Sequence, residues 1–68
     1  MKLSARNRLA GTVVSINRGE AIANVALDVG GQRIVASITV EAVDELGLHE
    51  GSSATAVIKA SDVMVAVD

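Results

Sequence analysis

Two short polar segments, near opposite ends of the chain, carry the donor groups that an oxyanion would need. Residues 4–7 (Ser-Ala-Arg-Asn) place a hydroxyl, a guanidinium and an amide side by side, and residues 59–61 (Lys-Ala-Ser) add an ammonium and a second hydroxyl. The small alanine and serine side chains also let the backbone N–H groups of both segments come close to a ligand. Oxyanions are bound by several converging donors together with one or two cations. The two segments are therefore candidates for an oxyanion site.

Both segments also have an ordinary interpretation. Short stretches of Ser, Arg and Asn are often solvated tails, and Ser and Asn side chains frequently bond only to nearby backbone. No base, nucleophile pair or cluster of metal ligands stands beside either segment, so the sequence does not indicate catalysis. The one histidine, His49, cannot form a zinc site with its local neighbours. The residue types alone thus leave anion binding and simple solvation both open.

The composition describes one small domain, residues 1–68, that needs support from other copies. Chains of this length bury little surface and usually rely on disulfides, a structural metal or oligomerisation. The sequence has no cysteine, which excludes disulfides. Half of the residues are hydrophobic, yet none is aromatic. A core within one chain therefore forgoes the roughly 150–250 Å² that each aromatic side chain would bury, and we expect the chain to assemble with copies of itself.

Charge and hydropathy argue against two common classes of partner. The net charge is −2 and the basic residues are scattered, whereas nucleic-acid binders show a basic face, and single-strand binders also stack bases on aromatic side chains. The longest apolar run is about five residues, far below the roughly 20 that span a bilayer. No signal peptide is visible at the N-terminus. We therefore expect a cytoplasmic protein that binds neither nucleic acid nor membrane.

Short runs of Val, Ile and Ala, broken by Gly or by Asn, Asp and Ser, predict an all-β fold. One or two helical turns are expected within residues 40–48, where acidic residues stand early and Gly47 provides a C-terminal stop. Five strands with a short helix between the third and the fourth make an OB-fold-like five-stranded barrel. The predicted strands are residues 8–17, 21–29, 32–39, 54–59 and 63–67.

A few single residues refine this fold prediction. Gly11, inside the first strand, marks either a β-bulge or a close approach of another backbone. Gly30 and Gly31 predict a two-residue hairpin, because both can take positive φ. Thr39 stands directly before the helical segment, so it can cap the helix, bind the anion, or do both.

Taken together and in this order, the motifs resemble the molbindin family, also called Mop, of small molybdate-binding TOBE-type domains. The resemblance runs through LSARN (3–7), AGTVVSI (10–16), the Gly-Gly hairpin, ASITVEAVDELGL (36–48) and EGSSATAVIKASDVMV (50–65), so it covers essentially the whole chain. SARN near the start combined with AVIKAS near the end is specific, whereas either alone would be weak. The resemblance implies a homohexamer, a trimer of dimers, that binds molybdate and also tungstate for intracellular storage, without catalysis.

The resemblance also implies where the oxyanion binds. The pocket would lie at a subunit interface, with the 4–6 segment from one subunit and Thr39 and the 59–61 segment from its partner. The protein would contact the oxygens of the anion and supply no direct ligand to the metal. The turn at 19–21 could form a second class of site, although a plain hairpin explains it as well. The residues concerned are Ser4, Ala5, Arg6, Thr39, Lys59, Ala60 and Ser61 for the pocket, and Gly19, Glu20 and Ala21 for the second site.

Two other functions stay open at this point. The chain could be a structural or interaction barrel whose interfaces serve assembly without a ligand. It could also be a cold-shock-like nucleic-acid binder on the same class of barrel, but the missing aromatic residues argue against this. Retention of molybdate during equilibrium dialysis would separate ligand binding from assembly alone.

Overall fold

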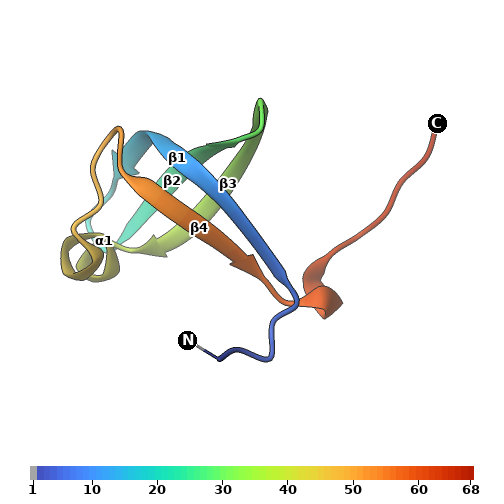
Figure 1. The fold of residues 1–68 in the computed structure, drawn as a ribbon. Helices are drawn as coiled ribbons and strands as arrows, with labels where there is room; N and C mark the ends of the chain where they lie inside the picture. Colours follow the sequence, from blue (N-terminus) through green and yellow to red (C-terminus); the bar gives the residue numbers. More distant parts are fainter. Residues whose placement is uncertain (1) are drawn as a thin grey trace.

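The fold is a small, strongly twisted antiparallel sheet with one short helix at its edge (Figure 1). A computed structural model describes residues 2–68. Its elements are β1 (Asn7–Arg18), β2 (Ile22–Val29), β3 (Gln32–Thr39), α1 (Val40–Leu46), β4 (Ser53–Ile58) and the 3-10 helix η1 (Ala60–Asp62). The strands lie in the order β3-β2-β1-β4, and every neighbouring pair is antiparallel. The β-rich class and the helix between the third and fourth strands are as predicted.

The prediction of a fifth strand at residues 63–67 is wrong for the single chain. After η1 the backbone is extended, but within residues 2–68 it pairs with no other strand, and it runs away from the sheet (Figure 1). The alternating Val and Ala residues there suit a strand, but a strand forms only where its N–H and C=O groups meet a partner edge. One described chain therefore supplies four strands of a sheet that does not close into a barrel.

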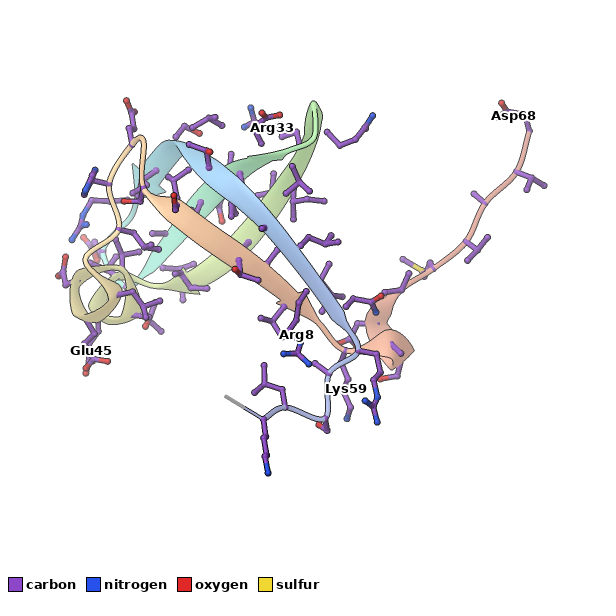
Figure 2. All side chains as sticks on the ribbon, viewed as in Figure 1. Arg8, Arg33, Glu45, Lys59 and Asp68 are labelled. Carbon is purple, nitrogen blue, oxygen red and sulfur yellow. The ribbon has the colours of Figure 1, made fainter. Side chains whose placement is uncertain are left out.

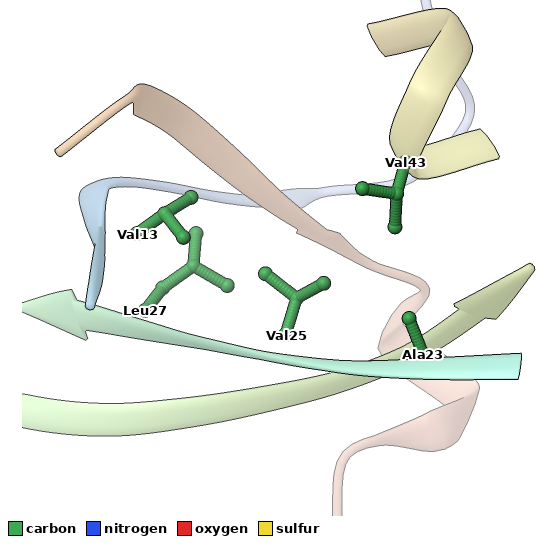
Figure 3. Packing of buried hydrophobic residues seen from close by; sticks show 5 residues of the cluster. All are labelled: Val13, Ala23, Val25, Leu27 and Val43. Carbon is green, nitrogen blue, oxygen red and sulfur yellow. The ribbon is translucent and has the colours of Figure 1, made fainter. Parts of the chain in front are cut away.

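The core is small and aliphatic. Ala23, Val25 and Leu27 project from one face of β2, as the period-two alternation of a half-buried strand requires. Val13 from β1 and Val43 from α1 complete the cluster (Figure 3), and none of the five is more than 4% exposed. A core this small stabilises a 68-residue chain only modestly, which agrees with the expectation that copies of the chain assemble.

Gly11 is required by a close backbone approach, which resolves the two interpretations of this residue. A Cβ at this position would collide with the backbone oxygen of Asp28 and lie 2.8 Å from Cγ2 of Val29. The β-bulge of β1 lies farther along, where the register with β2 shifts between Val13 and Ser15. The bulge and the glycine together let the long first strand pair with β2 along one part and with β4 along another.

The two turns that border β3 follow the sequence signals. Gly30 and Gly31 have φ of 56° and 86°, so the β2–β3 hairpin uses the positive dihedrals that only glycine adopts without strain. Thr39 caps α1, because its Oγ1 accepts a hydrogen bond of 3.0 Å from the backbone N–H of Ala42. Gly47 ends the helix in the left-handed region at φ 63°.

Replacing Thr39 with valine should lower the free energy of unfolding by about 1 kcal/mol, because the first turn of α1 loses its side-chain cap. Thr39→Ser keeps the hydroxyl and should retain most of the stability. Urea denaturation followed by far-ultraviolet circular dichroism, without added anions, measures both variants. A valine variant as stable as the original chain would show that the side-chain cap does not stabilise α1.

Candidate oxyanion site

The two polar segments, residues 4–7 and 59–61, lie at the same end of the pair of strands β1 and β4. Asn7 begins β1 and is paired in register with Ile58, the last residue of β4. The Asn7 side chain strengthens this pairing, because its Nδ2 donates a hydrogen bond of 3.2 Å to the backbone oxygen of Ile58. Residues 4–6 and 59–61 therefore start from neighbouring backbone positions. We call these two segments, together with Arg8, the β1–β4 corner.

Most of the positive charge of the chain gathers at or next to this corner. Four of the six Lys and Arg residues are found there, namely Lys2, Arg6, Arg8 and Lys59. Within residues 2–68 the one ion pair joins Arg18 to Asp44, with Nη2 2.8 Å from Oδ1, at the far end of β1. The corner cations thus have no carboxylate partner among the described residues, and their charge is available to an anion.

Arg8 is a corner residue that the sequence analysis missed. It pairs in register with Val57, two residues before Lys59, and Figure 2 shows Arg8 and Lys59 at this end of the sheet. No local motif marks Arg8 as a binding residue, because the surrounding sequence predicts only an ordinary strand. Its proximity to Lys59 follows only from the β1–β4 register, which joins distant parts of the chain.

The corner is rich in donors, and the acidic residue next to it is Asp62, which ends η1. Ser4, Arg6 and Lys59 are exposed, and Ala5 is half-buried. In η1 the N–H of Asp62 donates to the oxygen of Lys59 at 2.9 Å, and no side chain caps the start of this turn. The first N–H groups of such a turn have no partner inside it, so the backbone at residues 60–61 adds donors to the two hydroxyls and the cations. A small anion can accept from all of them.

Thr39 lies far from this corner within one chain. It pairs in register with Ile22 at the start of β2, and the next residue of β2, Ala23, pairs with Arg18 at the far end of β1. The Thr39 oxygen accepts from the helix N–H, but the hydroxyl hydrogen can still donate to a ligand. Capping and anion binding are therefore compatible for this residue, and its place in the fold means that a corner pocket could receive it only from another copy.

The turn at residues 19–21, predicted as either a plain hairpin or a second site, is well bonded as a connection. The N–H of Gly19 donates to the oxygen of Ile22, and the oxygen of Ala21 accepts from the N–H of Val40, both at 2.8 Å. Beside this turn and Thr39 is a shallow depression with an acidic lining, which would repel a dianion in the single chain. The acidic residues of that lining are Glu20, Glu41, Asp44 and Glu45.

Other kinds of site receive no support from the described part of the chain. Among residues 2–68 no group of three or more His, Cys, Asp or Glu side chains is placed to hold a metal ion. His49 is exposed, with its Nδ1 2.9 Å from the backbone oxygen of Glu50. In the same residues no helix is long and apolar enough to cross a membrane.

The division of the pocket between subunits stays a prediction. The family resemblance implies a pocket with the 4–6 segment from one subunit and Thr39 and the 59–61 segment from its partner. In the structure both segments extend from the paired residues Asn7 and Ile58 of one chain, so they start from neighbouring positions within each copy. A second copy is needed to bring Thr39, or a second set of the same segments, to that corner.

Several known proteins that are similar to this chain are named for binding molybdate or molybdenum-pterin. Residues 3–65 match the TOBE domain family. Molybdenum-pterin-binding protein 1 of Clostridium pasteurianum is 47% identical over 66 residues, which are 96% of this chain and 97% of that protein. The solved structure of a molybdate-binding protein from Sporomusa ovata is 39% identical with a TM-score of 0.95, and the match covers 98% of this chain and all of that one.

A third similar structure was solved with molybdate bound. The structure of the cytoplasmic molybdate-binding protein ModG with molybdate bound matches 94% of this chain at 54% identity, with a TM-score of 0.91. This chain spans 46% of the length of that protein. The match to the TOBE domain family, over residues 3–65, includes both segments of the β1–β4 corner.

Proposed function

We infer that this chain, which belongs to the TOBE domain family and within it to the small molybdate-binding Mop proteins, binds molybdate at the β1–β4 corner, as a binding module rather than an enzyme. The observation that carries this proposal is that residues 4–6 and residues 59–61 extend from the paired residues Asn7 and Ile58, beside cations that form no ion pair among residues 2–68. Lys59 would be the main counter-charge. Donors would come from the hydroxyls of Ser4 and Ser61 and from the backbone of residues 5, 6 and 60.

The chemistry of the corner suits molybdate better than phosphate. Molybdate is a tetrahedral dianion that carries no proton at neutral pH, so it needs donors and positive charge only. Protonated phosphate also needs an acceptor for its O–H, which cations and backbone N–H groups cannot provide, and an O–H left without a partner is costly when buried. Tungstate has the same charge and shape and should bind as well. Sulfate differs mainly in size, so its rejection would depend on the width of the pocket.

The pocket would be completed between copies of the chain. A corner exposed on one chain cannot exclude water from an anion, and Thr39 can reach it only from a neighbouring copy. A homohexamer built as a trimer of dimers fits this need, and it also fits the small aliphatic core. A second class of site at Gly19, Glu20 and Ala21 would require an assembly that offsets the acidic surroundings of that turn. The proposed role is storage of molybdate in the cytoplasm.

Equilibrium dialysis against molybdate, followed by elemental analysis for molybdenum, tests the proposal. We expect retention well above the buffer level, competition by tungstate, and little competition by phosphate. Retention at the buffer level would favour the alternative, a structural barrel that assembles without a ligand.

Bound molybdate should also raise the melting temperature. A ligand that binds only the folded protein stabilises it by about 2.7 kcal/mol at 100 times its dissociation constant, and each 1 kcal/mol shifts the midpoint of a domain of this size by about 4–8 °C. Thermal unfolding monitored by circular dichroism in increasing molybdate measures the shift. Sodium chloride at matched ionic strength is the control, and an equal shift in both salts would show general screening instead of binding.

A further inference from the structure

Arg8 lies on the outer face of the pair of strands β1 and β4, the face turned away from the core. Exposed and half-buried residues alternate along the start of β1, and Arg8 is exposed between half-buried Asn7 and Leu9. Its register partner on β4, Val57, is 46% exposed. Because successive side chains of a strand point to opposite faces, Arg8 and Val57 share this outer face.

Lys59 is placed diagonally to Arg8 at the end of the same pair of strands. It follows Val57 by two positions, and its backbone is still extended, with φ of −65° and ψ of 136°. In an antiparallel pair such diagonal neighbours are about 7–8 Å apart, which is within reach of long side chains. Figure 2 shows both residues at this end of the sheet. The guanidinium of Arg8 and the ammonium of Lys59 can therefore reach one small ligand.

Among the residues that the structure describes, no carboxylate pairs with either of these cations. The one ion pair within residues 2–68 joins Arg18 to Asp44. The strand β4 carries no charged residue, and Asp62 at the end of η1 forms no ion pair with Arg8 or Lys59. Like charges this close repel each other. The repulsion raises the free energy of the empty corner, and a bound anion would relieve it.

The charge of the ligand decides how much a second cation contributes. Lys59 alone can balance a monoanion, whereas a dianion such as molybdate leaves one negative charge over. Arg8 is the cation that the β1–β4 register fixes next to Lys59, and its planar fork of N–H groups suits two oxygens of one oxyanion. Coulomb energy is proportional to the product of the charges, so the loss of one cation weakens the attraction of a dianion about twice as much as that of a monoanion.

We propose that Arg8 is a specificity-determining residue of the corner, which binds the anion together with Lys59 and makes the site prefer tetrahedral dianions to tetrahedral monoanions. Its role rests on the molybdate site proposed above, to which it adds a residue and a selection by charge. The hydroxyls and backbone N–H groups of residues 4–6 and 59–61 would serve both classes of anion, so they do not separate them.

Two variants of Arg8 and one matched control test this role. Arg8→Gln removes the charge and keeps a polar side chain, and Arg8→Lys keeps the charge. Arg33→Gln is the control, because Arg33 is also an exposed cation of a strand but lies on the β2–β3 hairpin, away from the corner (Figure 2). The affinity for molybdate is measured by isothermal titration calorimetry at fixed ionic strength. Perrhenate, a tetrahedral oxyanion with a single negative charge, is measured by its competition with molybdate, so that weak binding is also detected.

We expect Arg8→Gln to weaken molybdate binding about tenfold, the effect of losing a hydrogen bond to a charged group, and perrhenate binding only about threefold. Arg33→Gln should change either affinity less than about twofold, because salt screens distant charges. Arg8→Lys should retain most of the preference for the dianion. Without ligand, Arg8→Gln should melt no earlier than Arg33→Gln, because the loss of Arg8 relieves repulsion at the corner.

Equal losses for the two anions in Arg8→Gln would overturn the selection by charge, and so would a molybdate loss no larger than in Arg33→Gln. A lower melting temperature of ligand-free Arg8→Gln than of Arg33→Gln would show that Arg8 supports the fold instead. The unsubstituted chain separates this role from the site itself. If it bound no molybdate, the proposed function would fail, whereas unchanged binding of molybdate in Arg8→Gln would remove Arg8 alone.

Discussion

Replacing Lys59 with alanine should weaken molybdate binding by about 1.5–3 kcal/mol, the contribution of a hydrogen bond to a charged group. Lys59 is exposed at the β1–β4 corner and has no carboxylate partner within residues 2–68. A dianion enclosed there without its counter-charge would be costly to desolvate. The dissociation constant by isothermal titration calorimetry is the measurement, and the size of the assembly by light scattering should not change.

The matched control for this prediction is Arg33→Ala. Arg33 is an exposed cation on the β2–β3 hairpin, away from the corner (Figure 2). Its removal changes the net charge by the same amount, so it isolates the local contribution of Lys59 from the overall field of the protein. Equal losses of affinity in the two variants, or no loss in Lys59→Ala, would remove Lys59 from the pocket.

Replacing Gly11 with alanine should destabilise the fold by about 1–3 kcal/mol, the usual effect of forcing extra atoms into a packed site. The added Cβ would meet the backbone oxygen of Asp28, and a backbone atom cannot rotate out of the way as a side chain can. A chain of this size rarely gains more than about 3–5 kcal/mol from its core, so much of its stability would be lost. Urea denaturation measured by circular dichroism gives the change.

Ala10→Ser serves as the control for Gly11→Ala. It adds one atom to the neighbouring residue of the same strand, but Ala10 is exposed and the addition should change stability by less than about 0.5 kcal/mol. If Gly11→Ala proved as stable as Ala10→Ser, the close approach of β1 to Asp28 would not be a constraint on the sequence.

Most of the fold could be predicted because its signals are local. The predicted strands at 8–17, 21–29, 32–39 and 54–59 each lie within one residue of β1, β2, β3 and β4 at both ends. Period-two alternation identifies which residues face the core, and the Gly30-Gly31 pair, Gly47 and the Thr39 cap mark where elements begin and end. These features depend on a few neighbouring residues, so they can be read without knowing what packs against them.

The features that could not be predicted depend on partners distant in sequence. Residues 63–67 have the pattern of a strand, yet whether they form one depends on an edge that the single chain does not present to them. Arg8 joins the corner only through its register with Val57. The same register makes residues 4–6 and residues 59–61 start from neighbouring positions at one end of the sheet. Such pairings depend on the tertiary structure, which local sequence patterns do not specify.

The pairing of Asn7 with Ile58 has a consequence for when the molecule can first hold its ligand. These residues are 51 positions apart, so their hydrogen bond closes a loop that contains most of the chain. Long-range closure is entropically unfavourable until the contacts inside the loop are made. A nascent or half-folded polypeptide would therefore lack the corner, and the proposed anion site would exist only in molecules that have finished folding.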